Sequence, residues 1–142
     1  MEGKTKLTNT EFEALLLYVF VAFSMAIRGV FLMFITQEKI TESAFYTIMD
    51  AIVPIEIWGT FMMIGAGFVI ACALSVTMRK YVFLIIGCLI GFIIGGGMVI
   101  LGFIAGMNLY TPLQTGIIAF FNLLLLVHGG VVVWRENKKT LM

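Results

Sequence analysis

The chain has 142 residues, of which 61% are hydrophobic and 12% are charged, and its formal net charge is +1. Soluble domains contain about 45–50% apolar and about 25% charged residues, so this composition excludes an ordinary soluble domain and indicates a membrane protein. The small net charge offers no field that would attract nucleic acid, and we expect no nucleic-acid partner. We predict a single transmembrane domain over residues 1–142.

Four apolar runs are long enough to cross a bilayer as helices, which takes about 20 residues each. Backbone groups in lipid need internal hydrogen bonds, and the runs lack the alternation of barrel strands, so helices are expected. We expect no cleaved signal peptide, because the first run exceeds the usual hydrophobic region of about 7–15 residues. The fold class predicted is therefore all-α, an integral membrane four-helix bundle. Its spans are expected at about 13–36, 52–77, 81–107 and 114–134.

Arg28 interrupts the first span, within the run VFVAFSMAIRGVFLMFI. A charge inside a membrane is costly without a partner, and the helical rise puts Glu56 and Asn122 at nearby depths. We therefore expect Arg28, Glu56 and Asn122 to cluster in the bundle interior, near the outer surface. Two interpretations remain open: a binding or conduction site, or a structural ion pair that fixes the register of the helices.

The segment 37–53, between the first two spans, is more than a plain linker. Phe45, Ile48, Met49 and Ile52 recur at helical spacing, with polar residues between them. This pattern predicts a short amphipathic helix over about 41–52 that lies on the outer surface. The alternative is an early extension of the second span.

The third predicted span is rich in glycine. Glycines four residues apart let helix backbones approach closely, which matters in lipid because no hydrophobic drive brings helices together. Such a face serves either packing within one chain or self-association into a homo-oligomer, and both alternatives stay open. The face comprises Gly87, Gly91, Gly95, Gly102 and Gly106.

His128 lies in the fourth predicted span, in the half nearer the C-terminus. Histidine can change its charge near neutral pH, so His128 is a candidate pH-responsive group. Tyr18 and Ser75 are expected in the same half of the bilayer and could hydrogen-bond to it. The alternative interpretation is a packing residue.

Basic residues outside the spans are unevenly distributed. Cytoplasmic loops carry an excess of Lys and Arg, so the side with more of them predicts the cytoplasm. Both termini are therefore expected to be cytoplasmic in a multi-pass protein of the cell membrane, and only Lys39 falls on the other side. The cytoplasmic set is Lys4, Lys6, Arg79, Lys80, Arg135, Lys138 and Lys139.

The sequence lacks the usual patterns of catalytic sites. Its His, Cys, Asp and Glu residues have no metal-ligand spacing, and there is no nucleophile elbow, P-loop or dinucleotide-binding pattern. Cys72 and Cys88 lie in apolar runs without a CxxC spacing. We therefore expect a non-enzymatic protein with no cofactor and no metal.

The layout resembles the small four-span membrane proteins of phages and prophages of Gram-positive bacteria. The resemblance implies a holin-like role or a role in exclusion or immunity, exerted by assembly or partner binding in the cytoplasmic membrane. Lipid and either a homo-oligomer or a membrane protein are the implied partners. The matching residues are Arg28-Gly29, Tyr46, Trp58-Gly59, Asn122-Leu123-Leu124 and Trp134-Arg135.

A second resemblance is to the DoxX-type four-helix membrane proteins, which pair an arginine in the first span with a glutamate and glycines in the second. Here the matching residues are Arg28, Glu56, Gly59 and Gly65. That likeness implies a redox-linked or small-molecule-binding role. From the residues alone, two further functions remain open: a transporter or channel subunit that uses an Arg28–Glu56 pair, and an accessory subunit of a larger membrane complex.

Overall fold

The computed structural model describes residues 9–75, 77, 79–106 and 110–140, and those residues form helices joined by short connections. Four helices are long and apolar enough to cross a membrane. The all-α fold class is therefore confirmed, and the length and composition of the four helices indicate a multi-pass membrane protein. The helices are α1 (Asn9–Met33), α2 (Gln37–Glu42), α3 (Ala44–Ile52), α4 (Ile55–Leu74), α5 (Lys80–Ile104) and α6 (Tyr110–Thr140).

The second span is shorter than the predicted 52–77. Pro54 precedes the helix and has no amide hydrogen, so α4 begins at Ile55. At the other end Ser75 leaves the helical conformation, with φ −86° and ψ 136°. Its side-chain Oγ donates to the carbonyl oxygen of Ala71 at 2.7 Å. A carbonyl of the last turn of α4 thus gains a partner where the helix ends.

The start of α4 is held by two bonds that cross the α3–α4 connection. The side-chain Oδ1 of Asp50 accepts a hydrogen bond from the backbone N–H of Ile55 at 3.0 Å. The indole Nε1 of Trp58 donates to the carbonyl oxygen of Val53, also at 3.0 Å. Asp50 therefore caps the first turn of α4 and ties it to α3.

We expect Asp50→Ala to lower the free energy of unfolding by about 1 kcal/mol, because the first turn of α4 loses its side-chain acceptor. Thermal denaturation of the purified protein in detergent measures the change. Asp50→Asn keeps an oxygen at this position and should be milder. Glu42→Ala, at an exposed position of α2, is the matched control, and an equal loss in both alanine variants would contradict the cap.

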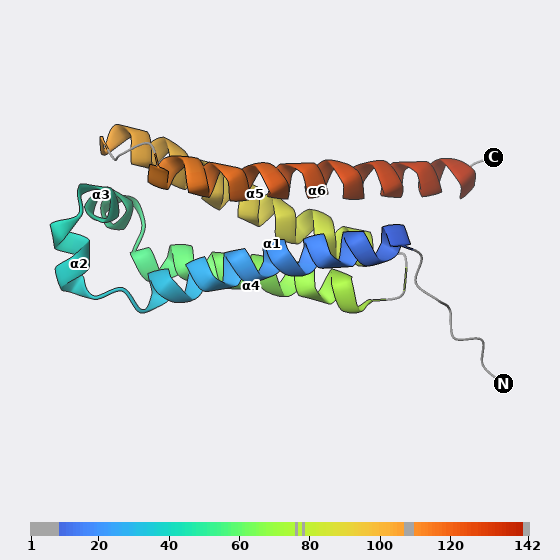
Figure 1. Ribbon diagram of the computed structural model, residues 1–142, viewed down its shortest axis with the longest axis horizontal. Coiled ribbons are helices and arrows are strands. Elements are labelled where there is room, and N and C mark those ends of the chain that lie inside the picture. Colours follow the sequence, from blue (N-terminus) through green and yellow to red (C-terminus); the bar gives the residue numbers. More distant parts are fainter. Residues whose placement is uncertain (1–8, 76, 78, 107–109, 141–142) are drawn as a thin grey trace.

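The amphipathic helix predicted over 41–52 is present as α3, which begins only at Ala44 because residues 41 and 42 belong to α2. It is a separate helix, not an extension of α4. Phe45 and Met49 are its buried residues. They pack with Leu32 of α1, Ile55 of α4 and Met98 of α5 in one apolar cluster. Together with α2, this helix covers one end of α1, α4 and α5 (Figure 1). We call this end the capped end and the opposite one the open end.

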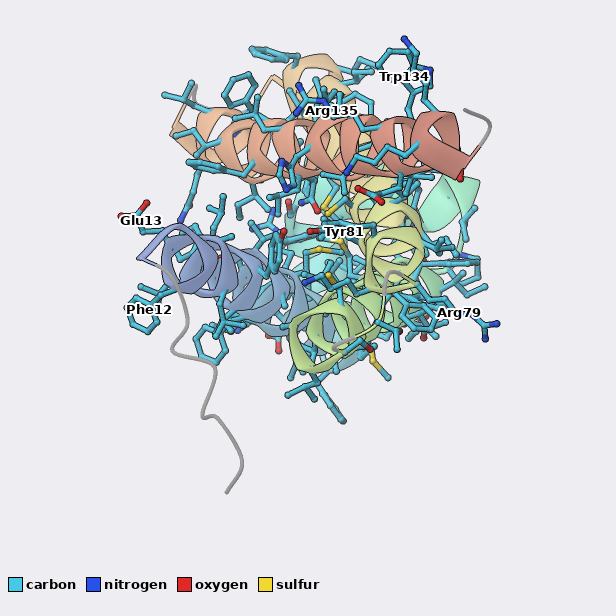
Figure 2. The ribbon with its side chains drawn as sticks, turned by 90° about the vertical axis from the view of Figure 1, so that its right-hand side faces the viewer. Phe12, Glu13, Arg79, Tyr81, Trp134 and Arg135 are labelled. Carbon is cyan, nitrogen blue, oxygen red and sulfur yellow. The ribbon has the colours of Figure 1, made fainter. Side chains whose placement is uncertain are left out.

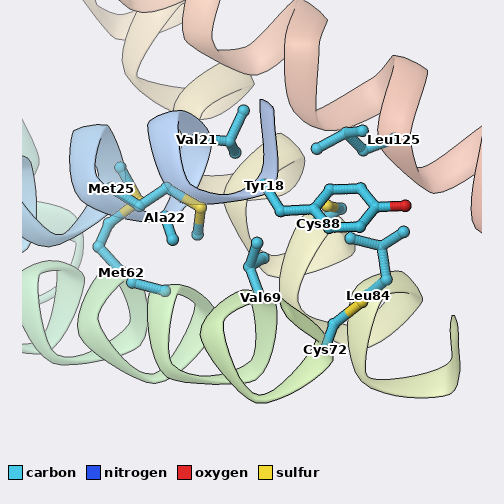
Figure 3. Packing of buried hydrophobic residues seen from close by; sticks show 11 residues of the cluster. Tyr18, Val21, Ala22, Met25, Met62, Val69, Cys72, Leu84, Cys88 and Leu125 are labelled. Atoms are coloured by element: carbon cyan, nitrogen blue, oxygen red, sulfur yellow. The ribbon is translucent and has the colours of Figure 1, made fainter. Parts of the chain in front are cut away.

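The four long helices pack in chain order: α1 on α4, α4 on α5, and α5 on α6. In contrast, α1 and α6 share few contacts, and the two ribbons are separated in Figure 1. All four helices nevertheless contribute to one apolar core toward the open end (Figure 3). The core residues are Tyr18, Val21, Ala22, Met25, Met62, Ala66, Val69, Cys72, Leu84, Cys88 and Leu125.

Two backbone-to-backbone contacts set the spacing of the helices. A Cβ atom on Gly59 of α4 would lie 2.7 Å from the carbonyl oxygen of Gly29 on α1. A Cβ atom on Gly87 of α5 would lie 2.7 Å from the carbonyl oxygen of Gly65 on α4. Neither distance leaves room for a side chain, so these glycines allow α1, α4 and α5 to approach closely.

Most of the predicted glycine face of α5 packs within the chain. Gly87 faces α4, while Gly91 and Gly95 face Asn122 and Ala119 of α6. Gly102 is also buried. Gly106 is not part of this face: it is exposed, follows the end of α5 and has a φ of +66°, the left-handed conformation common just beyond a helix C-terminus. For Gly87, Gly91 and Gly95, packing within the chain is the alternative that the structure supports.

Candidate functional site between α1 and α6

Arg28 reaches from α1 to α6 near the capped end. Its Nη2 donates a hydrogen bond to Oγ1 of Thr115 at 3.2 Å. Arg28 lies five residues before the last residue of α1, which is about 7.5 Å along the helix axis. Thr115 lies five residues after the start of α6, so the two side chains are at the same level. The Nε of Arg28 is buried and has no hydrogen-bond partner among the described residues.

The predicted ion pair between Arg28 and Glu56 does not form. Within the described part of the chain, the ion pair present is Lys139 with Glu136 at 2.7 Å, on the exposed surface of α6. The side chain of Glu56 is exposed in the first turn of α4, where the positive end of the helix dipole favours a carboxylate.

The packing of α1 on α4 explains why the pair is absent. Gly29 is the residue of α1 that lies against Gly59 of α4. Consecutive residues of a helix project about 100° apart, so Arg28 leaves α1 in a different direction from Gly29. That direction leads to Thr115 on α6.

Asn122 is in the interior, as predicted, with no exposed surface. Its Nδ2 donates to the carbonyl oxygen of Ile118 at 3.0 Å, while its Oδ1 has no partner among the described residues. The side chain fills the notch left by Gly91, where a Cβ atom would lie 2.5 Å from Oδ1. Met25 of α1 closes the same notch. Asn122 is two helical turns beyond Thr115 on the same side of α6. We call Arg28, Thr115 and Asn122 the polar seam.

The capping helix α3 comes close to this seam through Tyr46. The ring centroid of Tyr46 lies 6.1 Å from that of Phe31 on α1 and 5.1 Å from that of Phe45. Burial raises the pKa of the Tyr46 phenol above its usual value, and the positive charge of Arg28 opposes that rise. Arg28 is therefore close enough to affect Tyr46 electrostatically, and α3 borders the site.

Two features of the site were not anticipated from the sequence. Thr115 was not singled out, although it precedes Asn122 by seven residues and so shares its side of the helix. The close contact of Gly29 with Gly59 was not expected either. Thr115 could have been chosen from the sequence, because residue counting places it near the predicted depth of Arg28.

His128 is separate from the polar seam. It is exposed on α6 toward the open end, and its ring centroid lies 6.2 Å from that of Tyr81 in an edge-on arrangement. Ser75, one of the two expected partners of His128, instead donates its hydroxyl to the backbone of its own helix. The contact with Tyr81 favours the packing interpretation, and a response of His128 to pH stays a prediction.

Basic side chains gather at the open end, where α1 begins and α6 ends. Arg79, in the turn before α5, and Arg135 of α6 both lie there (Figure 2). The ammonium nitrogens of Lys80 and Lys138 lie over the rings of Tyr81 and Trp134, at 5.2 and 5.6 Å from the ring centroids. Lys39 lies in α2, at the capped end. Lys4 and Lys6 are outside the described residues.

Comparison with known proteins identifies no relative of this chain. Scans against protein-family models, curated proteins and solved structures find no match to this chain. The resemblances to four-span phage proteins and to DoxX-type proteins therefore stay predictions, and the functional argument rests on the polar seam.

Proposed function

We propose that this chain is a non-enzymatic membrane protein that acts by binding a partner within the cytoplasmic membrane, with Arg28 as the group that recognises it. The main support is the state of Arg28. It is an ionised side chain within a membrane-spanning helix, its Nη2 bonds to the neutral hydroxyl of Thr115, and its buried Nε–H lacks an acceptor among the described residues. A charge at such a place is costly unless an anion meets it, so intramembrane arginines mark binding sites.

The proposed arrangement is a four-helix bundle with both termini in the cytoplasm. The basic residues at the open end favour this orientation under the positive-inside rule. Arg28 and the capping helices α2 and α3 then lie toward the outer surface. The partner would approach between α1 and α6, because these neighbouring helices share few contacts.

The biological setting that fits best is a phage- or mobile-element-type protein with a role in exclusion or immunity. Binding without pore formation is favoured because Gly87, Gly91 and Gly95 are occupied by contacts inside the chain. A holin-like assembly would need another surface. An accessory subunit of a larger membrane complex would use the same binding mode, whereas a conduction site built on an Arg28–Glu56 ion pair is not retained.

Photo-crosslinking tests the proposed binding. A photoreactive residue at Gln114, which is exposed beside Thr115, should yield an adduct in intact membranes. We expect Arg28→Gln to weaken that adduct about tenfold, since a hydrogen bond to a charged group is lost. Arg79→Gln, at the open end, should leave it unchanged. A probe at Val127, which is exposed on the same helix nearer the open end, controls for general lipid contact. An adduct at Gln114 that is insensitive to Arg28→Gln would contradict the proposal.

A membrane-potential dye separates binding from permeabilisation. Cells that express the wild-type protein at low and high levels should keep their membrane potential. Collapse of the potential at low expression would replace the exclusion role with a holin-like one.

A further inference from the structure

We propose that the anion held by Arg28 is the phosphate of a membrane phospholipid, in the leaflet at the capped end. This inference rests on the proposed binding role of Arg28 and names the chemical class of its ligand. A phosphate group is the shared chemistry, and a lipid headgroup is the source that the surroundings of Arg28 favour.

The depth of Arg28 fits a lipid headgroup. The apolar part of α1 runs from Phe12 to Met33, which is about 33 Å, close to the thickness of the hydrocarbon core. Arg28 lies about 7.5 Å from the end of this segment that is nearer the capped end. The long aliphatic stem of an arginine lets the guanidinium reach toward the interface. Arg28 therefore lies within two helical turns of the interface at which lipid phosphates occur.

The surface around Arg28 fits a lipid better than a soluble anion. Ile27 and Phe31, on neighbouring turns of α1, are 56% and 41% exposed. Toward the open end, Phe20 of α1 and Phe121 of α6 meet edge to face with centroids 6.2 Å apart. The α1–α6 interface is therefore closed at the level of Asn122, and exposed apolar side chains of α1 flank Arg28. Such a surface suits a molecule with a phosphate head and acyl chains.

The chemistry of the guanidinium also suits this ligand. A phosphodiester has one negative charge, and its two unesterified oxygens accept hydrogen bonds from the planar N–H edge of an arginine. Arg28 is only partly buried, and no acidic side chain of the described residues forms an ion pair with its guanidinium. Acidic side chains are rare in transmembrane segments, whereas every phospholipid carries a phosphate at the interface toward which Arg28 can extend. A phosphate is thus the more available counterion.

The test uses the full chain, purified in a maltoside detergent that lacks phosphate, and native mass spectrometry to measure bound lipid. The probes are phosphatidylglycerol, a galactosyl diacylglycerol with the same acyl chains but no phosphate, and inorganic phosphate. We expect the wild-type protein to prefer phosphatidylglycerol over the glycolipid. Arg28→Gln should weaken the binding of phosphatidylglycerol about 10- to 100-fold, as expected when a hydrogen bond to a charged group is lost. Arg79→Gln is the matched control and should bind as the wild type does.

Each outcome decides the inference. Equal binding of phosphatidylglycerol and the glycolipid, or no effect of Arg28→Gln, overturns it. If inorganic phosphate competes with phosphatidylglycerol at a similar concentration, the ligand is a soluble phosphate compound and not a lipid, which overturns the inference. If Arg28→Gln does not fold, two other measurements decide the matter. They are the preference of the wild type for phosphatidylglycerol over the glycolipid, and the binding by Arg28→Lys, which keeps the charge but loses the planar pair of N–H donors. An Arg28-dependent protein adduct at Gln114 without phosphate preference would keep the proposed function and reject this ligand.

Discussion

Gly59→Ala is expected to lower the free energy of unfolding by about 3 kcal/mol, as overpacking of a close contact does. The added Cβ atom would lie 2.7 Å from the carbonyl oxygen of Gly29 and 2.9 Å from the backbone N of Met33. Both atoms belong to the backbone of α1, so a side-chain rotation cannot relieve the clash and α1 must move away from α4. Thermal or denaturant unfolding in detergent measures the loss.

Gly67→Ala is the matched control, because Gly67 lies on the same helix and a Cβ atom there meets nothing within 4 Å. Alanine has the higher helix propensity, so Gly67→Ala should be neutral or slightly stabilising. Equal destabilisation by both substitutions would show that the α1–α4 contact is not as close as described.

Gly91→Ala should also be strongly destabilising, by about 2 kcal/mol. Its Cβ atom would lie 2.5 Å from Oδ1 and 2.7 Å from Cγ of Asn122. That side chain has no exposed surface and is tied to Ile118, so it has little room to turn aside. The notch in α5 and the asparagine on α6 should therefore behave as one unit.

A double-mutant cycle measures this coupling. Asn122→Ala alone should destabilise by leaving a void, while Gly91→Ala combined with Asn122→Ala should cost less than the sum of the two single changes. Gly96→Ala, on the same helix with nothing within 4 Å of its Cβ atom, is the control. Additive losses from Gly91→Ala and Asn122→Ala would rule out the predicted clash.

The two glycine contacts also bear on the proposed binding role. Because Gly29 and Gly59 hold α1 against α4 and Gly91 holds α5 against Asn122, helices α1 and α6 are each fixed to a different neighbour. Their own mutual contact is correspondingly slight. Arg28 then spans the remaining distance to Thr115, which leaves a polar group near lipid without an ionic partner in the described chain.

The sequence by itself determined the helical class, the approximate bounds of the four long helices and the helical character of the segment before the second one, whereas the structure decided that this segment is a separate helix. These properties depend on local composition: apolar length, helical periodicity, and residues such as Asp50 and Pro54 that start or stop a helix. The position of Arg28 along its helix followed in the same way, because the rise of a helix is proportional to residue count.

The tertiary structure alone decided which side chains meet. Arg28 and Glu56 have similar predicted depths, yet depth does not specify the angle at which a side chain leaves its helix. That angle depends on which glycine lies against the neighbouring helix, and the contact of Gly29 with Gly59 directs Arg28 to Thr115. The same holds for the glycines of α5. Their spacing predicts a helix face without side chains, but the residue that packs against this face depends on the packing of all four long helices.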